Sequence, residues 1–178
     1  MILSGDKVIL RAIELADKDI LRNMINDGEM EYLLGGWSFP VSDLKQEDWI
    51  KSLDLEPHVL RCMIDSKQEH STTGTVILSD IDYINGTAQI HIKLLKSFRG
   101  KGFGTDTIKT MVRYAFSELR LQCIYAHIND YNIGSHKLFE KSGFKKEGVL
   151  RSRIYKNGTH HNLFVYSVLR GDFYGNRE

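Results

Sequence analysis

Residues 93–105 read Lys-Leu-Leu-Lys-Ser-Phe-Arg-Gly-Lys-Gly-Phe-Gly-Thr and combine residue types that bind phosphate. Glycines occupy three alternate positions: Gly100, Gly102 and Gly104. Glycine permits positive φ and lets the backbone approach a ligand closely. An amphipathic helix is predicted directly afterwards, so its unpaired N–H groups and the positive end of its dipole would face this loop. Together with the cationic side chains of Arg99 and Lys101, the segment predicts a site for phosphate oxygens.

Two common phosphate motifs do not fit this loop. The nucleotide P-loop requires Lys-Ser or Lys-Thr after its glycines, and neither pair follows here. The dinucleotide fingerprint Gly-x-Gly-x-x-Gly fails because Thr105 stands where the last glycine is needed. The pattern that remains is Arg-x-x-Gly-x-Gly, from Arg99 to Gly104. Taken alone, it is also compatible with a tight turn before a helix.

The elements around the loop follow from hydrophobic periodicity and turn residues. We expect strands over residues 7–13, 58–65, 72–82, 87–95, 122–128, 148–156 and 159–169. We expect helices over residues 17–27, 42–53 and 132–142, and a helix after the glycine loop with an apolar stripe from Ile108 to Leu119. Residues 28–40 read as an irregular aromatic segment. Asn85-Gly86 and Asn157-Gly158 predict two-residue hairpin turns.

This order of elements predicts the fold class. The strand, helix and strand over residues 87–128 require a right-handed crossover and one parallel strand pair. The remaining strands are expected to pair antiparallel. The sequence therefore predicts an α+β fold in αβα layers, with helices on both faces of a mixed, mostly antiparallel sheet.

Composition bounds the class of protein. The 178 residues are expected to form a single domain, 1–178, with a core of ordinary size. A net charge of +1 gives no reason to expect nucleic acid or a membrane surface as a partner. No stretch has the pattern of a membrane span or a signal peptide, and no Cys/His cluster has metal-ligand spacing. Cys62 and Cys123 lie in apolar runs and are expected to be buried free thiols, which indicates a cytoplasmic protein.

A second motif makes the phosphate loop more specific. Asn132-Ile-Gly-Ser135 is followed by Leu-Phe-Glu-Lys-Ser-Gly-Phe over residues 138–144, one helix and one strand beyond the glycine loop. Together, these segments and the order of elements resemble the GNAT superfamily of N-acetyltransferases over nearly the whole chain. The pattern of residues 148–167 is similar to the branch that holds ribosomal-protein N-terminal acetyltransferases and spermidine acetyltransferase. The resemblance implies a GNAT fold whose parallel strand pair is splayed to hold acetyl-CoA.

The resemblance also implies which residues hold acetyl-CoA. Backbone groups of Ile92, Lys93 and Leu94 would bond the pantetheine arm as if it were an added strand. The pyrophosphate would lie on six consecutive residues: Arg99, Gly100, Lys101, Gly102, Phe103 and Gly104. Asn132 would bond the outer pantetheine, although helix capping alone also explains this residue. Lys141 would approach the CoA phosphates, or it is a solvated helix lysine.

The implied reaction is direct attack of a primary amine on the thioester, and the sequence departs from the family at the positions of the acid and of a glutamate near the amine. The family's tyrosine acid is replaced by Phe139, and a glutamate found in spermidine enzymes is replaced by Gln89. Ser135, whose helix turn faces the thioester in the family, is our first choice of acid; Tyr131 or a water is the alternative. His91 is the leading base because an ordinary histidine pKa is near ~6.5, and a water chain is the alternative.

The acceptor amine is left open by the sequence. Glu31, Trp37 and Phe39 lie in the segment that covers the acceptor in this family, or they are core. Residues 35–40 hold no carboxylate, so a peptide N-terminus or a small amine ranks above a polyamine. The alternative outside the enzyme class is an acyl-CoA-binding protein without catalysis, suggested by Phe139 and Gln89. The resemblance is also compatible with a homodimer.

Overall fold

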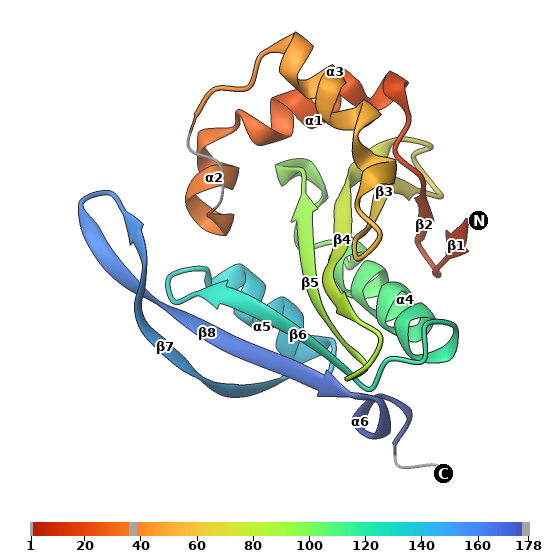
Figure 1. Cartoon of the computed structure of the whole chain (residues 1–178), viewed down its shortest axis with the longest axis vertical. Helices are drawn as coiled ribbons and strands as arrows, with labels where there is room; N and C mark the ends of the chain where they lie inside the picture. The colour runs from red at the N-terminus through yellow and green to blue at the C-terminus, as the bar shows by residue number, and fades with distance from the viewer. Residues whose placement is uncertain (1, 36–38, 176–178) are drawn as a thin grey trace.

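A computed structural model describes residues 2–35 and 39–175. Its centre is one eight-stranded sheet in the order β1-β2-β3-β4-β5-β6-β8-β7 (Figure 1). The strands are β1 (Leu3–Ser4), β2 (Val8–Arg11), β3 (Leu60–Ser66), β4 (Thr72–Asp82), β5 (Thr87–Leu94), β6 (Cys123–Asn129), β7 (Lys145–Lys156) and β8 (Thr159–Leu169). The α-helices are α1 (Lys18–Ile25), α2 (Gly28–Leu34), α3 (Asp43–Lys51), α4 (Phe103–Ser117), α5 (Ile133–Lys141) and α6 (Arg170–Tyr174). Among these residues, no helix is long and apolar enough to cross a membrane.

The predicted parallel pair is present and it opens along its length. β5 and β6 pair in parallel from Thr87↔Cys123 to Gln89↔Tyr125, and every other neighbouring pair in the sheet is antiparallel. Beyond Gln89 the register of this pair ends, and the two strands diverge (Figure 1). The mixed sheet with a splayed pair is therefore confirmed.

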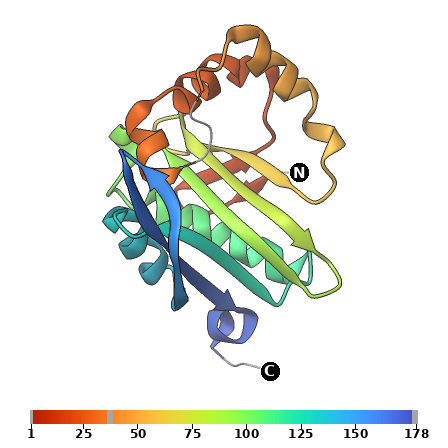
Figure 2. The ribbon, with the colours of Figure 1, turned by 60° about the vertical axis from the view of Figure 1, so that its left-hand side comes forward.

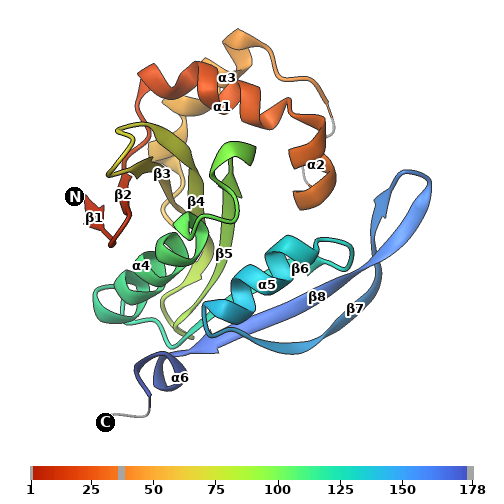
Figure 3. The same ribbon diagram turned by 180° about the vertical axis from the view of Figure 1, so that it is seen from behind.

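Helices cover both faces of the sheet. α4 and α5 lie on one face, which is turned toward the viewer in Figure 3, while α1 and α3 pack together over the other. The predicted stripe of α4 is buried at Ile108, Met111, Val112, Ala115 and Phe116. These side chains pack on the alternate apolar residues of β5, which explains why a helix and a strand with these periods dock here.

The irregular segment predicted over residues 28–40 is partly wrong, because residues 28–34 form α2. The Asp27 side chain accepts a hydrogen bond from the Met30 N–H at 2.7 Å and caps this helix. Gly28 is the first helical residue, where a glycine costs little, so it is no helix break. Gly35, with φ +70°, does end the helix. Short elements β1 and α6 were also not predicted.

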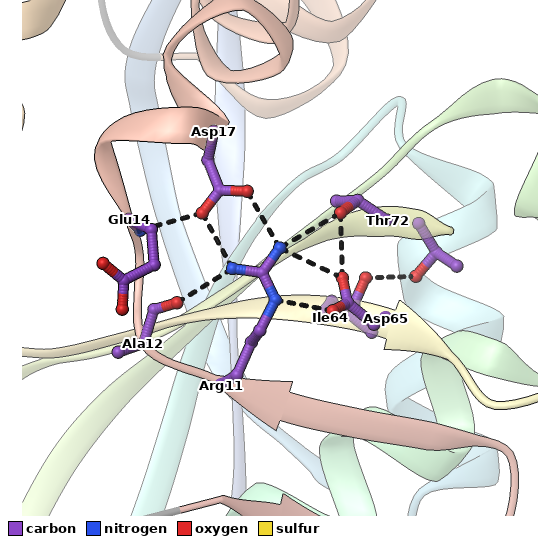
Figure 4. Close-up of polar contacts among 8 residues, drawn as sticks. Arg11, Ala12, Glu14, Asp17, Ile64, Asp65 and Thr72 are labelled. Atoms are coloured by element: carbon purple, nitrogen blue, oxygen red, sulfur yellow. Dashed lines mark hydrogen bonds and ion pairs between the residues drawn. The ribbon is translucent and has the colours of Figure 1, made fainter. Parts of the chain in front are cut away.

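An arginine network joins the N-terminal strands to the helical layer (Figure 4). Arg11 on β2 donates two hydrogen bonds of 2.8 Å to the two carboxylate oxygens of Asp17, just before α1. It also pairs with Asp65 on β3, which accepts a hydrogen bond from Thr72 on β4. One guanidinium therefore ties three strands to the start of α1.

The cysteine prediction holds in part. Both thiols are free, and Cys62 is buried, whereas Cys123 is half-buried. Burial raises the pKa of the Cys62 thiol to about 11, which makes it a poor nucleophile at neutral pH.

Candidate active site

A cleft of about 620 Å³ lies where β5 and β6 diverge. Its walls come from the end of β5, the glycine loop, the start of α5 and α2. Of the predicted cofactor residues, those that line it are Ile92, Leu94, Arg99, Gly100, Gly102, Gly104, Asn132, Ser135 and Lys141. The structure thus brings together, at one cavity, motifs that lie 30 to 50 residues apart in the sequence.

The glycine loop has the conformation that its sequence requires. Gly100 and Gly102 have φ of +74° and +89°, in the left-handed region that favours glycine. Gly102 is the N-cap of α4, so the first N–H groups of that helix point toward the loop. This geometry fits an anionic ligand such as a pyrophosphate.

Three predicted cofactor side chains lie away from the cleft wall: those of Lys93, Lys101 and Phe103. The Lys93 side chain lines a separate cavity on the other face of the sheet. The Phe103 ring is buried edge-on against Phe98, with 5.5 Å between centroids. The Lys101 ammonium lies over the same Phe98 ring, 5.8 Å from its centroid. The backbone groups of Lys101 and Phe103 remain part of the loop, so any contact they make there is through the main chain.

The Arg99 side chain is fixed by contacts within the protein. Its Nε donates to the Leu94 carbonyl at 3.0 Å, and its guanidinium pairs with Glu29 of α2 at 2.7 Å. Lys96 pairs with the same carboxylate at 2.9 Å, and these contacts lower the pKa of Glu29. The cation that the sequence assigned to pyrophosphate is therefore also a tether for α2.

Two lysines at the cleft were missed by the sequence analysis. Lys137 lies one turn before Lys141 on α5 and lines the cleft. Lys7, nearly 100 residues before the loop, donates from Nζ to the Lys101 carbonyl at 3.0 Å, and a Cβ on Gly102 would lie 3.2 Å from that Nζ. The i,i+4 spacing of Lys137 and Lys141 was visible in the sequence, but the approach of Lys7 depends on tertiary structure.

The end of β5 offers backbone groups to the cleft. β4 pairs with β5 up to Gly74↔Leu94, whereas β6 has already diverged after Gln89. Alternate N–H and C=O groups of residues 90–94 therefore face the gap rather than a neighbouring strand. The side chains of Ile92 and Leu94 form its apolar wall. This edge suits a ligand with amide groups, as predicted for Ile92, Lys93 and Leu94.

Asn132 caps α5 and contacts α2 as well. Its Oδ1 accepts from the Ser135 N–H at 3.1 Å, and its Nδ2 donates to the Leu33 carbonyl at 3.0 Å. Tyr131 donates from its hydroxyl to the Tyr32 carbonyl at 2.7 Å, and burial is the main cause that raises its pKa. The C-terminal end of α2 is thus bonded to the loop between β6 and α5.

Ser135 and Phe139 differ in access to the cleft. Ser135 is half-buried and lines it. The Phe139 ring is 3% exposed and packs edge-on against Phe144, with 5.0 Å between centroids. A hydroxyl donor is therefore present at Ser135 and at Tyr131, but not at the position of the usual tyrosine acid.

His91 lies on the opposite face of β5 from the cleft, because it alternates with the buried Ile90 and Ile92. Its Nε2 is 2.9 Å from the Ser79 hydroxyl on β4. Surrounding protein atoms desolvate the imidazole and lower its pKa, while Asp80 opposes the shift. His127, on the diverging part of β6, also has a pKa lowered by desolvation. It was not singled out from the sequence, where a lone strand histidine carries no signal.

The residues predicted for the acceptor segment differ in their surroundings. Glu31 on α2 forms an ion pair with Lys156 of β7. Phe39 is 71% exposed. Trp37 lies outside the described residues. Among the described residues, no group of three or more His, Cys, Asp or Glu side chains is arranged to hold a metal ion.

Comparison with known proteins agrees with this geometry. The family model described as Acetyltransferase (GNAT) domain matches residues 7–145. N-acetyltransferase p20 of Bacillus licheniformis is 30% identical over 177 residues, covering 97% of this chain and 98% of that protein. YdaF of Bacillus subtilis (strain 168), named provisionally as a ribosomal N-acetyltransferase, is 30% identical over 183 residues, with 97% of each chain covered.

A solved structure gives the same fold. Spermidine N-acetyltransferase from Vibrio cholerae, in complex with CoA and spermine, superimposes with a TM-score of 0.88 at 25% identity. The match covers 96% of this chain and 99% of that one.

The splayed sheet and the glycine-loop cleft are those of an acyl-CoA-dependent transferase. The chain belongs to the GNAT acetyltransferase family. It is an N-acetyltransferase that uses acetyl-CoA as co-substrate. The cleft fits that molecule, with cations at the glycine loop, an apolar wall and an open strand edge between them.

Proposed function

We propose that the acetyl group passes directly from acetyl-CoA to a primary amine in a ternary complex, at the gap between β5 and β6. The observation that carries this proposal is the arrangement around β5. The cofactor cleft opens on one face, and His91 with Ser79 lies on the other, next to the same gap. Donor and acceptor would thus approach the gap from opposite sides, as direct attack requires.

His91 is the proposed base. An aliphatic amine with a pKa near ~10 is protonated at neutral pH and must lose a proton before attack. Because desolvation lowers the pKa of His91, its imidazole is neutral at pH 7 and can accept that proton. A water chain ending at His91 would serve the same purpose.

The remaining roles fall on the cleft side. Backbone N–H groups of Ile92, Lys93 and Leu94 are proposed to hold the pantetheine and to stabilise the oxyanion. The loop from Arg99 to Gly104 and Lys141 would bind the phosphates, and Asn132 the outer pantetheine. Ser135 is the proposed proton donor to the leaving thiolate. With a thiol pKa of ~8.5, departure without a proton costs only about 2 kcal/mol, so this role is a modest one.

The acceptor is proposed to be a peptide N-terminus or a small-molecule amine. A polyamine is the second candidate, favoured by the solved Vibrio cholerae structure whose title names CoA and spermine. Against it, Glu31, a carboxylate of the acceptor segment, pairs with Lys156.

A thiol-release assay tests the proposal. Purified protein with acetyl-CoA is given separate peptide, amino-sugar and polyamine acceptors, while calorimetry measures CoA binding. Amine-dependent release of one thiol per acetylated product is expected. Tight CoA binding without thiol release from any acceptor would instead mean a binding protein.

We further propose that residues 1–178 act as a single acetyltransferase domain in the cytoplasm. The free thiols of Cys62 and Cys123 support a reducing compartment. A homodimer is compatible with this proposal, and sedimentation would measure the oligomeric state.

A further inference from the structure

A second cavity, of about 300 Å³, lies between the helical layer and the sheet face that carries His91. Leu21, Met24 and Ile25 of α1 and Trp49 of α3 cover it, and Ile77 of β4 lies in its floor. Its described walls are mainly apolar. A volume of this order holds a ring or a short branched chain, and apolar pockets with a few polar groups are the usual form of a ligand site.

The polar groups at this cavity are cationic or neutral. Lys45, Arg61 and Lys93 line it, and its described lining residues include no carboxylate. Arg61 lies over the Trp49 ring and pairs with Glu56, so its charge is balanced. Within the described part of the chain, the Lys93 side chain makes no hydrogen bond or ion pair. Desolvation lowers the pKa of Lys93, and a nearby anion would offset that cost.

A buried amide is also unused at this cavity. Gln46 on α3 is 5% exposed and lines the cavity. Its side chain makes no hydrogen bond to any other described residue. Because Gln46 lines the cavity, its amide oxygen and nitrogen are an acceptor and a donor that a ligand could use.

The cavity adjoins the proposed base through the register of the sheet. Ile77 in its floor is the direct β4 partner of His91, so the two residues are about 5 Å apart between Cα atoms. Lys93 follows His91 by two residues on the same face, about 7 Å along the strand. An acceptor with its amine at His91 would therefore extend over Ile77 toward the cavity and Lys93.

We propose that this cavity binds the body of the acceptor, and that the acceptor is a primary amine with an apolar skeleton and an anionic group at its far end. The apolar walls would take the skeleton, and Lys93 and Gln46 the anion. A polyamine carries a second ammonium instead, which would lie among cations without a carboxylate to receive it. This inference rests on the proposed function and assigns its acceptor class.

Three amines with one skeleton test the charge at the far end. These are 4-(aminomethyl)benzoate, benzylamine and 1,4-bis(aminomethyl)benzene, which share a benzylic nucleophile and carry an anion, a hydrogen and a cation at the para position. We expect kcat/KM to fall in that order, with the benzoate at least about ten-fold above benzylamine, since a hydrogen bond to a charged group is of this strength. Spermidine is included as the polyamine acceptor.

Lys93→Met tests the residue that would recognise the anion. It keeps the alkyl stem and the β5 backbone, and the preference for benzoate over benzylamine, as a ratio measured within the same variant, is expected to fall below about three-fold. Lys93→Arg should restore most of that preference. Lys109→Met, at an exposed lysine on α4, is the matched control and should leave the preference intact.

The outcomes separate this inference from the proposed function. Thiol release that is fastest with spermidine or with the diamine, or a benzoate preference unchanged in Lys93→Met, would overturn the acceptor class and leave the transferase intact. CoA binding without thiol release from any of the four amines would overturn the proposed function, and the acceptor class with it.

Discussion

Gly102 connects a backbone conformation to a binding property. Its φ of +89° places the first N–H groups of α4 around the glycine loop. A side chain here would be strained, and its Cβ would lie 3.2 Å from the Lys7 Nζ, beside the loop proposed for the pyrophosphate. We predict that Gly102→Glu raises the Kd for CoA at least about 100-fold in calorimetry, because bulk and negative charge are added at an anion site.

Gly143 provides the control for this prediction. It has φ +91°, and a Cβ there would meet no atom within 4 Å. Gly143→Glu therefore carries the same backbone strain, of about 1–2 kcal/mol, outside the cleft. It should lower stability by a similar amount and keep CoA affinity within about three-fold. Equal loss of affinity in both variants would mean that strain, and not the loop, controls binding.

His91 gives a pH dependence with a defined sign. Its pKa is lowered by desolvation, so the imidazole is a base at neutral pH and becomes protonated only on acidification. We predict that kcat/KM falls as the pH drops through this lowered pKa, below ~6.5. This fall in kcat/KM at low pH is the acidic limb of the pH profile. In His91→Gln the acidic limb should disappear, with kcat at pH 7.5 reduced by about 10- to 100-fold.

A histidine outside the site is the control. His160 is exposed on β8, and His160→Gln should retain both the rate and the acidic limb. If His91→Gln keeps an unchanged limb, the titrating group is elsewhere, with His127 as the next candidate since its pKa is lowered too.

At the level of elements, α2 connects the segment that follows β5 to the loop that follows β6, and it lines the cleft between them. Its first turn pairs with Arg99 and Lys96 through Glu29, and its last carbonyls accept from Asn132 and Tyr131. If Arg99 binds the CoA phosphates as proposed, Glu29 competes with the phosphate oxygens for its guanidinium. Since exposed ion pairs are worth about 0.2–1 kcal/mol, we predict that Glu29→Gln tightens CoA binding by about two- to five-fold in calorimetry.

The salt dependence of that change supplies its check. The gain in Glu29→Gln should shrink at 0.5 M salt, where exposed charges are screened. Glu118→Gln, at an exposed position after α4, should not alter CoA affinity. Weaker CoA binding in Glu29→Gln would show that the ion pair orders Arg99 for its ligand rather than competing with it.

Local signals predicted most elements of this fold. The α4 stripe and the Asn157-Gly158 turn depend on neighbouring residues, and they lie where the sequence put them. The two-residue turn predicted at Asn85-Gly86 is wrong, because Asp82 pairs with Thr87 and the hairpin closes through the four residues 83–86. α2 was missed because Gly28 reads as a break, while the Asp27 cap that starts the helix is a single side chain. Its place over the cleft depends on contacts with residues 60 to 100 positions away.

The same distinction applies to the site. The glycine loop and the Asn132 segment were predicted because their residue types are tied to local conformation. Lys7, which directly precedes β2, reaches the loop, and the cavity near Lys93 is formed by α1, α3 and three strands. Such positions carry no local pattern, so only tertiary structure reveals them.

The whole molecule places the two proposed sites on opposite faces of one sheet. Figures 1 and 2 show α4 and α5 on one face of this sheet and α1 and α3 over the other. The proposed donor cleft lies beside α5, and His91 and the second cavity lie on the face under α1 and α3. The two faces meet where β5 and β6 diverge. The proposed acceptor cavity beside the gap therefore requires that α1 and α3 keep their positions over the sheet.

The Arg11 network is a polar connection between that helical layer and the strands (Figure 4). The Asp17 side chain is 8% exposed. Burial alone would raise the pKa of Asp17, but hydrogen bonds from Arg11 and from the Glu14 N–H outweigh it and lower the pKa. We predict that Arg11→Met lowers the free energy of unfolding in urea by about 3 kcal/mol at pH 7, because it leaves a buried carboxylate unpaired.

Acidification should reduce this difference. A carboxylate with a lowered folded pKa contributes its full stability above the unfolded pKa of ~3.9 and loses it as the pH falls through the folded value. In Arg11→Met, burial instead favours the protonated acid, so the unpaired charge is removed at higher pH. The difference in the free energy of unfolding between the unchanged protein and Arg11→Met should therefore become smaller below about pH 4. Arg113→Met, at an exposed position on α4, should show neither effect. If this difference in the free energy of unfolding is the same at all pH values, Arg11 stabilises the α1 and α3 layer through its packing and not through Asp17.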